Sequence, residues 1–542
     1  MTLPDKESWR VRTDLTILIA VLAFVMLTTA NGWGVVETSE ARYAEISREM
    51  ITTHDWLHPT LLNIHHYHKP PLTYWITALA YSIFGVNNFS VRFFLTIAFC
   101  AQVLLVFKLS VRLFRSEQIA FYSSLVFATL PLVLISVRGL TTDAYLNLFV
   151  LFSIYLLICF FQDGKIRFLY LASVSMGLGF LTKGPVIFVV PLMAILGSWK
   201  FLSKSRVTVV QAIVALLIFA MVAFSWFSYL IVSDPRFFDY FVLHHFVDRI
   251  AHAEVFSRKE PWYYYLPILP LVTIPWIITF ASTIFRMPTS DDERIARRVL
   301  LWWFIFPLLL FSISSSKLIL YILPLSIGFS IVTGYYLSVN KSSKPLFITS
   351  LVIILIYAGL TLIPFSLNLR STILLMVIPV ISLALSVAAT YSGISRQKLI
   401  TVWSGLFAVC LISYASLFFR LNSDKVNTLS DVSLFIKEKG LEKGNIVVYD
   451  ELLPSLAFEL NREVVFLYGG NRSLQREVQF EENENWRFYL IDTSQKPGRN
   501  LSTLLSGKSV LITKKELPPN LSSIVERDWH NQVIGKWTVY YK

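Results

Sequence analysis

The sequence is dominated by long apolar windows that recur from Leu15 to Phe419. Each window holds roughly 18 to 25 residues, enough for a helix to cross about 30 Å of hydrocarbon. About thirteen such windows predict a polytopic α-helical membrane protein, because no soluble core needs so much apolar surface when only 15% of the residues are charged. The windows are 13–31, 90–113, 118–137, 144–162, 168–182, 185–201, 207–232, 262–285, 298–316, 318–338, 345–366, 371–392 and 398–419.

The placement of basic residues predicts the orientation in the membrane. The formal net charge is +13, and much of it lies in every second short loop. Basic loops gather on the cytoplasmic side, so we expect a multi-pass protein of the cell (inner or plasma) membrane with a cytoplasmic N-terminus. An odd number of spans then leaves the C-terminus extracytoplasmic. Dispersed loop charges do not make the contiguous basic face that nucleic-acid binding needs.

The first extracytoplasmic loop, 32–89, is long and has apolar residues at helical spacing on both sides of Pro70 and Pro71. We expect two amphipathic helices at the membrane surface, the second opened by the double proline. Two later loops on the same side, 236–265 and 312–324, carry further polar residues. Polar groups therefore gather on one face of the membrane.

After Arg420 the hydropathy falls, and short β-type runs alternate with helix-like segments. This pattern predicts a small extracytoplasmic α/β domain over 420–542, following a transmembrane catalytic domain over 1–419. No Gly-rich phosphate loop follows any of the strands, so we expect a structural or acceptor-contacting role for this domain. The predicted strands are 445–450, 463–468, 487–492, 509–514 and 537–542.

Asp143 stands in a loop of a few residues between two apolar windows. An acid there is costly to desolvate and is more often functional than decorative. The charges of the first loop have two interpretations: a solvated helix face with (i, i+3) and (i, i+4) ion pairs, or part of a site with Asp143. Those charged residues are Glu37, Glu40, Arg42, Glu45, Arg48 and Glu49.

A histidine cluster, 65–68, precedes Lys69 and the double proline. It is either ordinary polar surface or half of a metal site, because His244 and His245 offer ligands from a second segment. Lys69 is placed to hold a lipid phosphate as a point charge. Further candidate cations are Arg249 and Arg258, whereas Arg138 and Lys183 lie at helix ends where they can simply snorkel.

Several motifs occur in a fixed order: SEARYAEISREM, HDWLHP, HKPPLTYW, TTDAYL, LTKGP, HHFVDR, EPWYYYLP and SSSKLILYILPL. Together they cover roughly 37–325, and this region resembles the ArnT-type (aminoarabinose transferase) GT-C glycosyltransferases, relatives of the protein O-mannosyltransferases. The resemblance implies that Arg42, Lys69 and Arg249 contact the donor phosphate and that Asp143 is an active-site carboxylate. It also implies that His68 could bind zinc with His244 or His245.

Ser39 departs from the pattern of that family, which usually has Asp at this position. Serine cannot act as the general base, so either the role passes to Glu37, Glu40 or Asp143, or the acceptor chemistry differs. We favour Glu40 with Asp143 as the catalytic pair, His68 with His245 as the metal ligands, and zinc as an optional cofactor.

The resulting hypothesis is inverting transfer of a sugar from a polyprenyl phosphate to an extracytoplasmic acceptor. Such a reaction needs a carboxylate near the acceptor hydroxyl and cations on the departing phosphate. A lipid A-like glycolipid is the expected acceptor, with a protein or another glycan as alternatives. The two alternative functions are a membrane transporter and a non-catalytic membrane scaffold. A transporter would place ionisable residues near the midplane of several helices, whereas here they gather at one surface. A scaffold gives no reason for the polar loops to share one side.

Overall fold

The computed structural model describes residues 6–542 apart from 38, 203–205, 242–259, 285–289, 341, 368, 371, 477, 494–500 and 526–527. The chain divides into two compact units. We call Met1–Thr29, Leu95–Arg138 and Thr142–Ala415 the helical unit. We call Ala30–Phe94, Gly139–Thr141 and Ser416–Lys542 the sheet unit.

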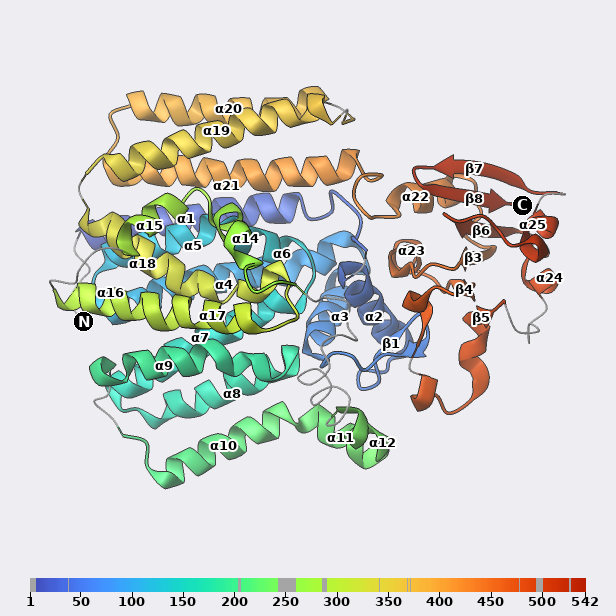
Figure 1. Ribbon diagram of the computed structural model, residues 1–542, viewed down its shortest axis with the longest axis horizontal. Coiled ribbons are helices and arrows are strands. Elements are labelled where there is room, and N and C mark those ends of the chain that lie inside the picture. The colour runs from blue at the N-terminus through green and yellow to red at the C-terminus, as the bar shows by residue number, and fades with distance from the viewer. Residues whose placement is uncertain are drawn as a thin grey trace. The chain divides into compact units, whose positions relative to one another are not determined.

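Seven helical segments in the described residues are long and apolar enough to cross a membrane (Figure 1). Three further pairs of helices pass the same test together, but each pair is bent at a short break, by 55°, 57° and 112°. The single segments are α1 (Lys6–Thr28), α4 (Asn88–Phe114), α7 (Thr142–Asp163), the run of α16 (Asp291–Val299), η4 (Leu300–Ile305) and α17 (Phe306–Ile313), then α19 (Lys344–Ser366), α20 (Thr372–Tyr391) and α21 (Arg396–Leu421). The bent pairs are α5 (Glu117–Thr129) with α6 (Pro131–Arg138), α10 (Val209–Ala223) with α11 (Ser225–Ser233), and α14 (Tyr265–Thr273) with α15 (Ile277–Ile284).

The polytopic helical architecture is confirmed, because ten of the predicted windows coincide with the seven single segments and the three bent pairs. The total of about thirteen spans stays a prediction. Three predicted windows do not qualify. Two of them form apolar helices of fewer than 18 residues, 185–198 and 325–339. The third is α8 (Ile166–Lys183), whose charged ends, serines and glycines dilute its apolar content. The shorter elements of this unit include η1 (Pro185–Phe188), α9 (Val189–Leu202), α12 (Arg236–Phe238), η5 (Ile319–Ile322) and α18 (Leu325–Val339).

Small residues let the helices of this unit approach closely, as is usual where lipid supplies no hydrophobic drive for association. A Cβ built on Gly334 of α18 would lie 2.3 Å from the backbone nitrogen of Ser123 on α5. A Cβ on Gly177 of α8 would lie 2.7 Å from the side chain of Val222 on α10. By contrast, α10 exposes large apolar side chains such as Leu216 and Met221, as a lipid-facing helix does.

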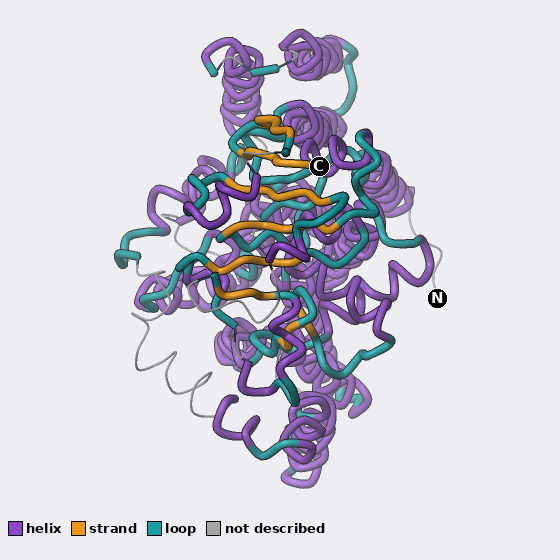
Figure 2. Tube along the Cα trace, turned by 90° about the vertical axis from the view of Figure 1, so that its right-hand side faces the viewer, coloured by secondary structure: helices purple, strands orange, loops and turns teal. Residues whose placement is uncertain are grey.

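The sheet unit contains a six-stranded sheet with the order β5-β4-β3-β6-β8-β7 (Figure 2). The four strands from β5 to β6 are parallel, and β8 and β7 extend the β6 edge antiparallel. All five predicted strands are present, whereas β7, which is largely exposed, was missed. The strands are β3 (Asn445–Tyr449), β4 (Val465–Tyr468), β5 (Leu490–Asp492), β6 (Ser509–Thr513), β7 (His530–Ile534) and β8 (Trp537–Tyr541).

Both faces of the sheet are covered, which explains why β3 and β6 are buried along their length. On one face lie α22 (Ser430–Glu438) and α23 (Pro454–Leu460), together with first-loop helices α2 (Ser39–Thr53) and α3 (Leu72–Phe84). On the other face lie α24 (Leu501–Leu504) and α25 (Pro519–Val525). A small hairpin of β1 (Thr60–Leu61) and β2 (Ile64–His65) joins α2 to α3, and the 3-10 turns are η6 (Arg472–Leu474), η7 (Val478–Phe480) and η8 (Glu484–Phe488).

The two first-loop helices are confirmed, and Pro71 immediately precedes α3 as the double proline predicted. Ile46 and Met50 of α2 pack into the same core as Ile446 and Val448 of the sheet. The first loop therefore folds together with the C-terminal segment, and this packing explains why most of α2 is buried.

Candidate functional site

The acid singled out in the short loop, Asp143, occupies the first turn of α7 in the helical unit. Its Oδ1 lies 2.5 Å from Nζ of Lys183, the last residue of α8. The two side chains are only 12% and 13% exposed, so the charges neutralise each other away from bulk water. A buried pair of this kind is costly to assemble, and it is weak evidence for stability by itself.

Further motif residues surround this pair within the helical unit. Lys183 Nζ lies 4.4 Å from the centre of the Tyr321 ring. The hydroxyl of Tyr265 donates to the carbonyl of Leu318 over 3.1 Å, and Tyr265 lies within electrostatic range of Asp143. Residues from TTDAYL, LTKGP, EPWYYYLP and SSSKLILYILPL thus meet around one carboxylate.

Sequence reasoning did not pair Lys183 with Asp143, because it interpreted Lys183 as a residue that can simply snorkel. A signal was nevertheless present. The predicted topology places the end of α8 and the start of α7 on the same side of the membrane, each with one charge of opposite sign. Two lone opposite charges on adjacent apolar helices are expected to pair, because polar groups inside membranes rarely stay single.

Glu40, the other predicted catalytic carboxylate, lies in the sheet unit on the first turn of α2. Its Oε1 lies 2.9 Å from Nη2 of Arg92 and accepts a bond from the backbone nitrogen of Leu140 over 3.2 Å. Its Oε2 accepts the backbone N–H of Val36 over 2.9 Å. Both carboxylate oxygens therefore have partners inside the protein.

Arg92, near the start of α4, was not predicted as a site residue. Its side chain is fully buried, and its guanidinium lies 4.1 Å above the Trp33 ring. It donates to the carbonyls of Ala30, Trp33 and Gly34 over 2.8, 2.9 and 3.2 Å. Arg92 thus fixes the chain where it enters α2.

The remaining acids and bases of α2 form a buried network and not a solvated face. Arg48 donates to both oxygens of Glu45 over 2.6 and 2.8 Å, the (i, i+3) pairing expected for a helix. Glu49 accepts the Thr60 hydroxyl over 2.5 Å and the Asn63 N–H over 3.1 Å. Burial, together with the charge of Glu45, raises the pKa of Glu49 to about 8.

The Glu49 contacts hold the β1–β2 hairpin, which leads into the histidine cluster and Lys69. His65 Nδ1 lies 2.9 Å from Oε1 of Glu481. The rings of His66 and His68 lie 4.4 Å apart at an angle of 64°. Lys69 is half-buried directly before Pro70.

Arg42 is half-buried on α2, and its buried Nε has no hydrogen-bond partner in the described part of the chain. Ser39, at the departure from the family pattern, is exposed as the first residue of α2. Glu37 is buried, and its Oε1 accepts the N–H of Ser455 over 2.8 Å. Burial raises the pKa of Glu37 to about 7 despite that bond.

Arg249 and His245 lie outside the described residues, as do His244 and Arg258. The described residues alone contain no group of three His, Cys, Asp or Glu side chains that could hold a metal ion. The metal site of His68 with His245 therefore stays a prediction. The predicted catalytic and phosphate-binding roles also stay predictions. Asp143 belongs to the helical unit, whereas Glu40, Arg42 and Lys69 belong to the sheet unit.

Comparison with protein families matches residues 68–226 to the dolichyl-phosphate-mannose-protein mannosyltransferase family. The undecaprenyl phosphate-alpha-4-amino-4-deoxy-L-arabinose arabinosyl transferase of Serratia proteamaculans is 29% identical over 336 residues, 61% of this chain and 59% of that protein. The protein of the same name from Erwinia tasmaniensis is 27% identical over 85% of this chain and 86% of its own length.

Among solved structures, ArnT from Cupriavidus metallidurans bound to undecaprenyl phosphate superposes with a TM-score of 0.76. The match covers 97% of both chains at 19% sequence identity, so it shows the shared fold. The chain spans less than two thirds of the length of some of these relatives. It covers 59% of the Serratia protein and 53% of the protein of the same name from Enterobacter sp..

Proposed function

This chain is an ArnT-type GT-C membrane protein, and on that premise we propose that it transfers an aminopentose from a polyprenyl phosphate to a lipid A-like acceptor. The proposed donor is the undecaprenyl phosphate sugar named for the relatives of this chain. A polyprenyl tail can remain in hydrocarbon while its phosphate reaches polar side chains at the membrane surface. Such a donor suits a chain with seven to ten candidate spans and polar loops.

The buried Asp143–Lys183 pair is the observation that carries this proposal. Two charges are removed from water at the end of apolar helices, where the desolvation cost is high and a functional role is the usual reason for it. We assign to Asp143 the task of accepting the proton of an acceptor hydroxyl or of orienting an acceptor oxygen. Lys183 holds that carboxylate in place.

The reaction proposed is a direct displacement at the anomeric carbon. The acceptor oxygen forms a bond to that carbon, the bond to the donor phosphate oxygen breaks, and the configuration inverts. Charge grows on the departing phosphate, so cations lower the barrier most effectively there. We assign that role to Arg42 and Lys69 in the sheet unit and to Arg249.

Glu40 is assigned a positioning role in this scheme. Its two oxygens accept bonds from Arg92, Val36 and Leu140, which supports a function in holding the entry to α2. Asp143 then carries the carboxylate chemistry. This choice also accounts for Ser39, because the chemistry no longer depends on an acid at that position.

A second acceptor class follows from the family match over 68–226, whose described activity is mannosyl transfer to protein. The localisation proposed is the inner membrane, with the N-terminus cytoplasmic and the C-terminus extracytoplasmic. The alternation of basic loops supports this orientation.

The test is a transfer assay with the full chain in membranes. Labelled undecaprenyl phosphate aminoarabinose and a labelled polyprenyl phosphate mannose are supplied in parallel with lipid A. We expect label from the aminopentose donor to appear in lipid A with inverted anomeric configuration. Label from mannose in protein would favour the second acceptor class, and no consumption of either donor would refute the proposal. A chelator arm, repeated with His68→Ala, tests the predicted metal.

A further inference from the structure

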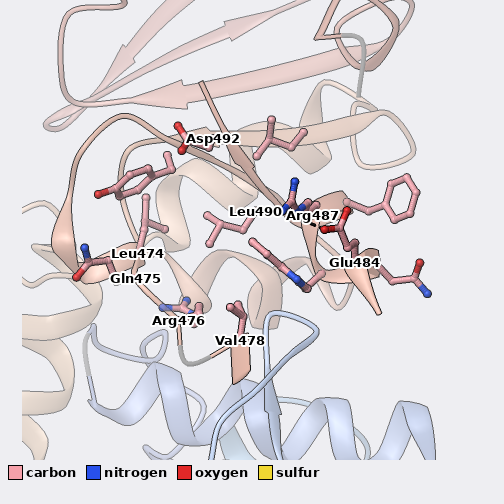
Figure 3. A pocket seen from close by; sticks show the side chains of 13 residues that line it. Leu474, Gln475, Arg476, Val478, Glu484, Arg487, Leu490 and Asp492 are labelled. Carbon is pink, nitrogen blue, oxygen red and sulfur yellow. Dashed lines mark ion pairs between the residues drawn. The ribbon is translucent and has the colours of Figure 1, made fainter. Parts of the chain in front are cut away.

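The sheet unit holds a cavity of about 850 Å³ beside β4 and β5 (Figure 3). Its wall is formed by residues between Tyr468 and Asp492, a segment that neither the sequence motifs nor the proposed mechanism uses. The wall combines two guanidinium groups, Arg476 and Arg487, with the acids Glu484 and Asp492. Such a cavity suits a polar ligand.

The two arginines of the wall differ in their surroundings. Arg487 pairs with Glu484 over 3.1 Å, and both side chains are mostly exposed. Arg476 instead has a buried Nε with no hydrogen-bond partner in the described part of the chain, and its Nη1 donates to the carbonyl of Ser473 over 3.2 Å. A buried donor without a partner costs free energy, the more so on a charged group.

A second cation, Arg42 of α2, lies within electrostatic range of Arg476. The positive charge of Arg42 acts on Arg476, and the blue first-loop helices pass beneath Arg476 in Figure 3. Burial and the Arg42 charge lower the pKa of Arg476 to about 10, so it remains protonated at neutral pH. Nε of Arg42 is also buried without a hydrogen-bond partner among the described residues.

The acid whose charge acts on Arg476, Glu49, does not neutralise the two arginines fully. The carboxyl of Glu49 acts on Arg476, but it is already bonded to Thr60 and Asn63. Its raised pKa of about 8 leaves it largely protonated at neutral pH. Two guanidinium groups that repel each other, each with a buried Nε that has no hydrogen-bond partner among the described residues, are an arrangement that an anion with several acceptor oxygens would relieve.

We propose that Arg476, together with Arg42, binds a phosphate group, and that the cavity lined by Arg476 receives the polar headgroup attached to that phosphate. Guanidinium groups suit phosphate because their planar donors match its oxygens bidentately. The acids of the cavity wall complement the hydroxyl and amino groups of a sugar. The identity of the phosphate rests on the proposed function: it belongs either to the polyprenyl donor or to the acceptor glycolipid.

The test uses the purified full chain in detergent. Binding of undecaprenyl phosphate and of diphosphorylated lipid A is measured by the shift of the thermal unfolding midpoint, with undecaprenol and dephosphorylated lipid A as uncharged controls. Arg476→Gln is compared with Arg472→Gln, which removes an exposed arginine of η6 that is not among the residues lining the cavity. Arg476→Lys tests whether charge alone restores binding.

We expect Arg476→Gln to weaken binding of at least one phosphate lipid by about tenfold or more, the scale of a lost charged hydrogen bond. The affinity of Arg476→Gln for the uncharged lipids, and the affinity of Arg472→Gln for the phosphate lipids, should each change less than twofold. Without ligand, the midpoint of Arg476→Gln should stay unchanged or rise, because the repulsion between Arg476 and Arg42 is removed. Loss confined to undecaprenyl phosphate identifies a donor site, and loss confined to lipid A identifies an acceptor site.

Unchanged affinity of Arg476→Gln for both phosphate lipids would overturn the inference, whatever its midpoint. Transfer by the wild type is measured on the same preparation. If the wild type transfers sugar but Arg476→Gln binds normally, only this inference fails. If Arg476→Gln loses phosphate binding while the wild type transfers nothing, the anion site stands and the proposed function fails.

Discussion

Asp143 and Lys183, 40 residues apart in the sequence, form a buried ion pair with 2.5 Å between Oδ1 and Nζ. The pair joins the first turn of α7 to the last residue of α8. Removing one partner leaves the other charge buried alone, which costs far more than the pair itself contributes. This asymmetry provides the first prediction.

Lys183→Met should lower the free energy of unfolding by about 3 kcal/mol, because the Asp143 carboxylate is left without its cation. Transfer should fall at least tenfold in the protein that remains folded. Lys183→Arg should restore part of both. Denaturant unfolding in detergent and the transfer assay check this, and the double variant with Asp143→Asn should be more stable than Lys183→Met alone. Wild-type stability and rate in Lys183→Met would contradict the assignment.

Glu40→Gln separates a positioning role from a catalytic one. The substitution removes the counter-charge of the fully buried Arg92, so the free energy of unfolding should fall by about 3 kcal/mol. Transfer per folded molecule should remain within a few-fold of the wild-type rate. A general base would behave in the opposite way, with a loss of 10²–10⁴ in rate and little change in stability. Parallel rate and unfolding measurements distinguish the two.

The stability of the sheet unit should fall as pH rises from about 5 to 8. Burial raises the folded-state pKa of Glu49 to about 8, above its ordinary value of 4.5. Between these two values the unfolded chain loses the proton while the folded chain keeps it, so folding becomes less favourable by up to about 1.4 kcal/mol per pH unit. Glu37, with a raised pKa of about 7, contributes in the same direction.

Glu49→Gln should therefore flatten the pH dependence of the unfolding midpoint. Glu484→Gln is the matched control, since that side chain is 76% exposed. An unchanged slope in Glu49→Gln would show that Glu49 is ionised in the folded protein throughout this range.

Gly334→Ala should destabilise the helical unit strongly. The added Cβ would meet the backbone of Ser123 at 2.3 Å, and backbone atoms cannot move aside cheaply. Gly359→Ala on α19 meets nothing within 4 Å and should be neutral or stabilising by up to about 1 kcal/mol, the helix propensity of alanine over glycine. Thermal unfolding of the two variants side by side is the measurement, and equal midpoints would contradict the close packing of α5 and α18.

The sequence predicted most of the fold because apolar length and strand alternation are local signals. The first-loop helices, the start of α3 after Pro71 and five strands of the sheet lie where expected. Hydropathy alone does not reveal that 185–198 and 325–339 form helices of fewer than 18 residues. The exposed edge strand β7 lacks the apolar alternation that marks a half-buried strand.

The candidate site was harder to predict because it depends on pairings between distant residues. Asp143 stood out in the sequence, but its partner Lys183 resembled a residue that snorkels at a helix end. The charges of α2 left a solvated face with ion pairs and part of a site as alternatives; the (i, i+3) pair of Glu45 with Arg48 is present, but it is buried. That burial depends on packing α2 against the C-terminal sheet, and no pattern within α2 reports such a long-range contact.

The most direct test of the central claim is the rate of sugar transfer from undecaprenyl phosphate aminoarabinose by Asp143→Asn. Asp163→Asn serves as the control, because Asp163 lies at the opposite end of α7 in an ion pair with Arg112 at 2.8 Å. The account predicts a loss of at least 10²-fold for Asp143→Asn, in the range of a lost general base, and a rate within twofold of wild type for Asp163→Asn. Transfer by folded Asp143→Asn at the wild-type rate would contradict it.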